Sequence, residues 1–198
     1  MADNEVPTVW RQHLMSRVAD TPNLDWLVLT KRIGNARQML SDASMHDGRL
    51  LTANDEYRPP SNLWIGATIV NRDELVRDAA KLKTTPAAKH FWSVEPMLGD
   101  LGHIPGELFP DWVIVGGESG PDARPMNPDW ARSLRDQCQA AGVPFFFKQW
   151  GEWAPYGRGR LDSSLLVDRS ALDTPYIKVG KKLAGRLLDG RTWDEVPA

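Results

Sequence analysis

Side chains capable of chemistry follow five short apolar runs of this sequence, at residues 25–32, 63–70, 90–96, 111–119 and 143–151. Each run turns polar or glycine-rich at its carboxyl end. The residues there are Thr30, Lys31, Arg32, Thr68, Asn71, Glu95, Gly116, Gly117, Glu118, Ser119, Lys148 and Gln149. Two carboxylates and two or three cations at one rim would suit a small zwitterionic or phosphate-bearing ligand, because each ligand charge would meet an opposite charge.

Three of these residues, Glu95, Glu118 and Lys148, are the candidate catalytic residues, since a positioned carboxylate or amine can transfer protons. The other nine are candidate ligand-binding residues. Among them, Gly116 and Gly117 allow a sharp backbone turn or a close approach to a ligand. The alternative is that the charged residues pair with one another as a structural ion network. The pocket is favoured because all five runs end in this way, and desolvated charges are costly to keep for structure alone.

Familiar chemical motifs are absent from the glycine-rich stretch "GGESG". No Gly-Lys-Ser/Thr follows it, so it is not a phosphate loop, and no G-x-G-x-x-G begins a helix. The stretch also lacks the G-x-S-x-G pattern of a nucleophile elbow. The chemistry must therefore be argued from the rim residues.

The elements that would position these residues are alternating strands and helices. Continuous apolarity in the five runs is typical of strands covered on both faces, as in a parallel sheet, whose ligands bind at the carboxyl ends of the strands. Asn71 with Glu74 predicts a capping box at the start of one helix. Asn127 and Pro128 predict the start of another, which Gly142 ends. A third is expected over residues 8–19, with Thr8 as its cap.

Length and composition limit the classes of partner that are expected. The chain has 198 residues and a net charge of -2, so one domain is the default and no global attraction to nucleic acid or an acidic membrane is expected. Without a signal peptide or a long apolar stretch, a cytoplasmic location is expected. Cys138 is the only cysteine and the four histidines are scattered, so no metal site is predicted.

From about residue 155 the pattern changes to glycine, turn residues and short apolar pieces. Two domains or regions are therefore predicted, residues 1–154 as the main domain and residues 155–198 as an irregular extension packed on it. The basic residues of the extension are nearly offset by its acids, which favours a solvated face over a nucleic-acid patch.

Six stretches together, "LTKR", "LWIGATIVN", "SVEPMLG", "DWVIVGGESGPDARPM", "FFFKQWGEW" and "VGKKLAGRLLDGRTWDEVP", resemble a phage and prophage protein family of unknown function. Its full-length members begin with a three-cysteine segment similar to that of radical S-adenosylmethionine (SAM) enzymes. The resemblance implies a TIM-like (β/α) barrel, and an iron-sulfur cluster with SAM in full-length relatives. The cysteine segment is absent here, so no cofactor is expected in this chain.

By this resemblance the fold class is α/β, a partial barrel of about five parallel strand-helix units that lacks the first two, plus the extension. Its function would be that of the C-terminal portion of a radical-SAM-like enzyme with a polar ligand pocket, either a truncated product or one completed by another chain. The alternative is a non-catalytic phage protein that binds a host or nucleic-acid partner, with a regulatory or anti-defence role. Self-association, or a tail that covers an open strand edge through "SLLV" or "YIKV", is also expected.

Overall fold

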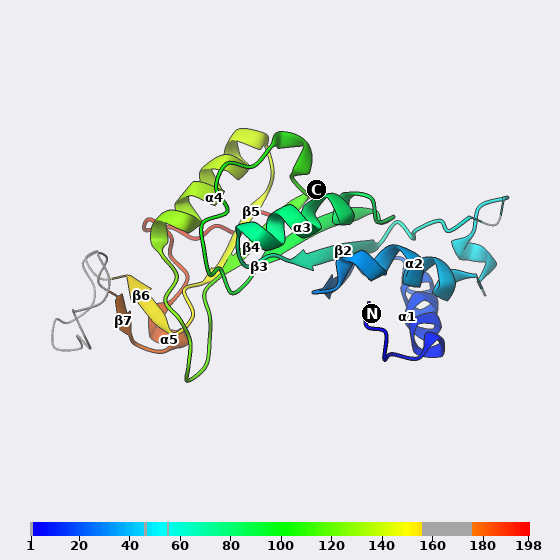
Figure 1. The fold of residues 1–198 in the computed structure, drawn as a ribbon, viewed down its shortest axis with the longest axis horizontal. Coiled ribbons are helices and arrows are strands. Elements are labelled where there is room, and N and C mark those ends of the chain that lie inside the picture. Colours follow the sequence, from blue (N-terminus) through cyan, green and yellow to red (C-terminus); the bar gives the residue numbers. More distant parts are fainter. Residues whose placement is uncertain (1, 46, 55, 156–175) are drawn as a thin grey trace. The chain divides into compact units, whose positions relative to one another are not determined.

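The computed structural model describes residues 2–45, 47–54, 56–155 and 176–198 (Figure 1). They form two compact units. The first comprises Met1–Thr68 and Val76–Ser93, and the second Ile69–Leu75 and Val94–Ala198.

Five parallel strands alternate with helices, as the apolar runs predict. The strands are β1 (Trp26–Thr30), β2 (Leu63–Thr68), β3 (Lys89–Val94), β4 (Trp112–Gly116) and β5 (Phe145–Gln149), and the sheet order is β1-β2-β3-β4-β5. Every residue of β2 is buried, which confirms that a continuous apolar run here marks a strand covered on both faces. The protein is thus of the α/β class.

The two helices with the clearest sequence signals begin where those signals predict. In α3 (Arg72–Lys83), the Asn71 side chain accepts a hydrogen bond from the Glu74 backbone N–H at 3.0 Å. The Glu74 carboxylate accepts from the backbone N–H of Val70, one residue before the predicted partner. In α4 (Pro128–Ala141), the Asn127 side chain accepts from the Asp129 N–H, and Gly142 ends the helix with a φ of 67°.

Two helices of the first unit differ from expectation. α1 (Thr8–Asp20) begins at the expected residue, but its N-cap is Pro7 and Thr8 is already helical, so the Thr8 prediction was wrong by one position. α2 (Ile33–Ser44) lacks a capping side chain at Arg32 and was not predicted. Its buried residues Ile33, Ala36, Leu40 and Ala43 recur at helical spacing, a signal that could have found it.

The amide of Asn62 joins three backbone carbonyls in the first unit. Its Nδ2 donates to the carbonyls of Val18, Thr21 and Leu24 at 2.8 to 3.0 Å. Asn62 is 4% exposed, so these bonds satisfy polar groups that water does not reach. They hold the end of α1 against the chain that enters β2.

The second unit carries the short elements of the C-terminal region. Strand β6 (Trp153–Pro155) pairs antiparallel with β7 (Tyr176–Lys178), and α5 (Lys181–Ala184) follows; Figure 1 shows the three close together. Of the two stretches expected to cover an edge, "YIKV" therefore lies largely in β7 against β6, and "SLLV" lies outside the described residues.

Residues near the C-terminus run along the outer side of β5. The Phe147 N–H donates to the Trp193 carbonyl at 2.9 Å, and Phe146 forms an antiparallel bridge with Asp194. The Phe145 N–H donates to the Glu195 carboxylate at 2.9 Å. The outer edge of β5 is thus occupied by the chain's own tail.

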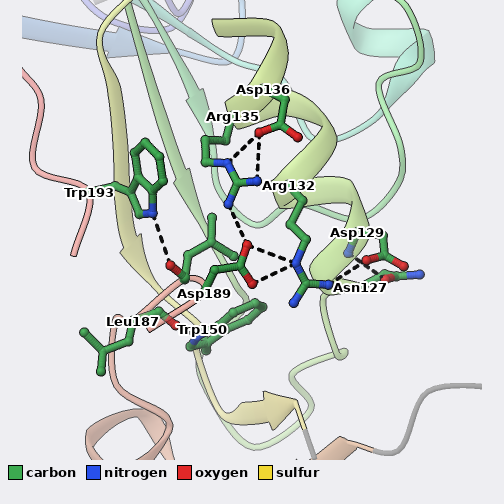
Figure 2. Close-up of polar contacts among 10 residues, drawn as sticks. Asn127, Asp129, Arg132, Arg135, Asp136, Trp150, Leu187, Asp189 and Trp193 are labelled. Carbon is green, nitrogen blue, oxygen red and sulfur yellow. Dashed lines mark hydrogen bonds and ion pairs between the residues drawn. The ribbon is translucent and has the colours of Figure 1, made fainter. Parts of the chain in front are cut away.

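A cluster of charged and aromatic side chains fixes this tail to α4 (Figure 2). Asp189 accepts from Arg132 Nε at 2.9 Å and from an Arg135 terminal nitrogen at 2.6 Å. Two guanidinium groups lie over the Trp193 ring, that of Arg191 at 3.5 Å and that of Arg135 at 5.1 Å from its centroid. We call these five residues the tail clamp.

Protonation of Asp189 is opposed by the same contacts. Burial would raise the pKa of its carboxyl, but the hydrogen bonds from Arg135 and Arg132 outweigh burial and hold that pKa below its ordinary value. The clamp therefore contains a carboxylate that stays ionised at neutral pH.

Candidate functional site

The second unit brings four of the predicted site residues into one hydrogen-bonded network. Lys148 Nζ lies 2.8 Å from Glu95 Oε2, and Gln149 Nε2 donates to Glu95 Oε1 at 3.0 Å. Gln149 Nε2 also lies 3.3 Å from the Ser119 hydroxyl oxygen. Glu95 follows β3, Ser119 follows β4, and the other two end β5, so the network lies at the carboxyl ends of three strands. We call it the Glu95 network.

An irregularity in β5 makes the network possible. Val115 pairs with Phe147, but Gly116 pairs with Gln149, so Lys148 is an extra residue in the ladder. In a regular strand, two successive side chains point to opposite faces, whereas a bulge re-aims one of them. Lys148 and Gln149 can therefore both reach the carboxylate of Glu95.

The network is only partly removed from solvent. The Lys148 side chain is 49% exposed and that of Glu95 is 20% exposed, while Gln149 is buried. A solvent-facing ion pair is worth about 0–1 kcal/mol to folding, because water screens it. Water therefore screens the Lys148 end of the pair, whose ammonium is open to solvent, more than the Glu95 end.

Both glycines of "GGES" lie close to other parts of the chain. A Cβ on Gly117 would lie 1.9 Å from the carbonyl oxygen of Trp150, and one on Gly116 would lie 3.1 Å from the Glu95 carboxyl. A Cβ on Gly151, which has a φ of 82°, would likewise lie 2.0 Å from the Glu118 carbonyl oxygen. The two loops thus interlock, and this packing alone accounts for a glycine at position 117.

Glu118 is bound by an arginine of its own loop. Arg124 donates to it from Nε at 2.8 Å, from a terminal nitrogen at 2.7 Å and from its backbone N–H at 2.8 Å. These hydrogen bonds lower the pKa of Glu118 to about 2, the side-chain bonds contributing most. Glu118 is therefore a firmly ionised carboxylate, poorly suited to act as a general acid at neutral pH.

The remaining predicted residues have local roles of their own. Asn71 caps α3, as described, and Thr68 is buried at the end of β2. In the first unit, the Thr30 hydroxyl accepts from the Arg32 N–H at 3.0 Å, and Arg32 forms an ion pair with Asp3 at 3.0 Å. Lys31 is exposed in that unit. A single pocket that joins Lys31, Glu95, Glu118 and Lys148 stays a prediction.

Two residues near the site had no role in the sequence interpretation. Arg124 is the partner of Glu118, and the Glu152 carboxylate accepts from the Gly120 N–H at 3.3 Å. In the stretch "GGESGPDAR", the arginine follows the glutamate by six residues. This spacing fits neither helical nor strand periodicity, so it did not predict the pairing. The tight loop between them creates it.

No group of three or more histidine, cysteine or acidic side chains that could hold a metal occurs in the parts of the chain that the structure describes. Cys138 is buried in α4, and burial, with a smaller effect of Glu195, raises the pKa of its thiol to about 12. Within the described ranges, no helix combines the length and apolar character that a bilayer crossing requires.

An α/β protein with a polar network at the carboxyl ends of its strands is the class that fold and site define. The chain belongs to the family described as "Protein of unknown function (DUF5131)", whose model matches residues 1–197. No curated protein and no solved structure matches the chain significantly.

Proposed function

We propose that this protein binds a small polar ligand through the Glu95 network, as the ligand-binding portion of a radical-SAM-like enzyme built on a (β/α) barrel. The bulge at Lys148 carries the proposal, because it directs two successive side chains of β5 to one carboxylate. Bulges are over-represented beside active sites, where they re-aim side chains. The barrel, the phage origin and the radical-SAM relationship rest on the sequence resemblance.

The ligand class follows from the charges of the network. A half-exposed ammonium next to a carboxylate presents opposite charges about 3 Å apart. A zwitterion, such as an α-amino acid group, can place its carboxylate on Lys148 and its ammonium on Glu95. The buried amide of Gln149 would hold the Glu95 carboxylate in position during this exchange.

The described residues do not fit an iron-sulfur cluster. Such a cluster is held by several cysteine thiolates, whereas this chain has only Cys138, whose thiol is buried and protonated. Any cluster that works with this protein would need thiolates from outside the given sequence. The role proposed for this chain is accordingly to bind and orient the ligand.

Calorimetric titration with SAM and with methionine tests the proposal, using the variants Glu95→Gln and Lys148→Met. We expect each variant to weaken binding about tenfold, because charge-assisted hydrogen bonds are worth about 1.5–3 kcal/mol. Unfolding midpoints should stay nearly constant. Lys81→Gln is the matched control, since Lys81 is also half-exposed and pairs with Asp78 at 3.3 Å.

Two results would oppose the proposal. If neither compound binds the unaltered chain, the zwitterion site is wrong. If Glu95→Gln lowers the unfolding midpoint sharply and Lys81→Gln does not, the network is a structural ion network, the alternative reading of these charges.

A further inference from the structure

The outer side of β1 leaves apolar side chains and backbone groups available. Leu27 and Leu29 are 45% and 47% exposed. β1 is at the end of the sheet order, and among the described residues no strand or isolated bridge lies against its outer side. An edge strand with exposed leucines is a template for another strand.

The pairing with β2 shows which backbone groups are available. The Trp26 N–H donates to the Asn62 carbonyl at 2.8 Å, and Trp26 is in register with Leu63. Backbone groups alternate in direction along a strand, so the even-numbered residues of β1 bond to β2. The N–H and C=O groups of Leu27 and Leu29 therefore point outward.

The sequence of this edge is complementary to itself when it is reversed. In "DWLVLTK", with Val28 at the centre, Leu27 is opposite Leu29 and Asp25 is opposite Lys31. Leu27 and Leu29 have outward-pointing backbone groups, as a hydrogen-bonded antiparallel pair requires. Asp25 and Lys31 are exposed, so both are available for a cross-strand pair.

We propose that β1 pairs antiparallel with β1 of a second copy of this chain, with Val28 on the two-fold axis, and that this pairing takes the edge that further strands of a (β/α) barrel would otherwise occupy. A two-fold interface needs a surface complementary to itself, and this edge supplies it in apolar contact and in charge. Each dimer would contain two Leu27–Leu29 contacts and two Asp25–Lys31 ion pairs. The partner is a second copy because an antiparallel copy of this strand places Asp25 opposite Lys31 and Lys31 opposite Asp25.

Charge reversal with rescue tests the register. Sedimentation velocity over a range of concentrations should show a monomer–dimer equilibrium for the unaltered chain. Asp25→Lys and Lys31→Asp should each raise the dissociation constant about tenfold, because like charges then face each other at both ends. The double variant, with both substitutions, should restore it. A chain that stays monomeric throughout, or a double variant weaker than both single ones, overturns the proposal.

Cross-linking provides a second, independent readout. Val28→Cys would bring two thiols together at a pair without hydrogen bonds, where opposing Cα atoms are about 4.5 Å apart. We expect a covalent dimer on mild oxidation. Val76→Cys, at an exposed position of α3, is the control, and the buried Cys138 is present in both. Equal dimer yields from the two variants would overturn the proposed pairing.

Discussion

The two strands at the ends of the sheet order differ in whether their outer edge is covered by the chain itself. The edge of β5 bonds to Trp193, Asp194 and Glu195 from the same chain. The edge of β1 exposes Leu27 and Leu29. The unpaired backbone groups of an edge strand tend to pair with another strand. In β5 the chain's own tail meets this need, whereas in β1 no described residue does.

The difference shows what an intramolecular cover requires. A tail bonds weakly to a strand unless something holds it, because ordering its backbone costs about 1–2 kcal/mol per residue. Here the tail clamp supplies that hold through ion pairs and through stacking on Trp193. β1 has no such cover among the described residues, and its self-complementary pattern suits a cover from a second copy.

Removal of residues 186–198 should reduce stability the most, because it exposes β5 as an edge and removes the buried Leu188. We expect the variant to aggregate or to lose its cooperative unfolding transition, monitored by light scattering and circular dichroism. Val196→Ala, at a position 60% exposed, is the control and should behave as the full chain. A stable monomer after the longer deletion would show that β5 needs no cover.

Trp193→Ala should cause the next largest loss of stability. The ring packs edge-on against Phe145 and contacts the guanidinium groups of two arginines, so its loss should reduce the free energy of unfolding by about 3 kcal/mol. Chemical denaturation measures this. Trp10→Ala, at a position 64% exposed, should change it by less than about 0.5 kcal/mol. Equal effects would mean that the clamp does not anchor the tail.

Asp189→Asn should have a smaller effect, about 1–2 kcal/mol, because it removes the charge that two arginines share. Asp189 has a φ of 54°, which asparagine also tolerates, so the turn should survive.

The same variant predicts a pH dependence. Since the folded pKa of Asp189 is lowered, its stabilising contribution is present above the ordinary value of 3.8 and is lost as pH falls through the lower folded value. Stability measured from pH 7 to pH 2 should therefore fall less in Asp189→Asn than in the unaltered chain. Asp42→Asn, on the exposed side of α2, is the charge-matched control. An identical loss of stability at acidic pH in Asp189→Asn and in the unaltered chain would contradict the lowered pKa of Asp189.

Leu29→Thr on the open edge should have the smallest effect on folding. In dilute, monomeric samples we expect a change below about 0.5 kcal/mol, because the side chain is half-exposed and threonine suits a strand. Thermal unfolding at low protein concentration is the measurement. A loss as large as that of Trp193→Ala would show that the β1 edge is covered in the monomer as well.

Local signals in the sequence determined much of the fold. Four of the apolar runs contain their strands and the fifth begins one residue after the start of β3, while the caps Asn71 and Asn127 and the stop Gly142 lie where predicted. These features depend on neighbours a few residues apart, so periodicity and capping chemistry identify them.

Only the tertiary structure decided how the site residues are used. The bulge at Lys148 depends on register between two strands, and the need for glycine at position 117 depends on the approach of a loop more than thirty residues away. The pairing of Glu118 with Arg124 depends on the path of a loop, and the cover of β5 on contacts across about fifty residues. Each results from chain segments that meet only on folding, so no pattern confined to one segment could specify it.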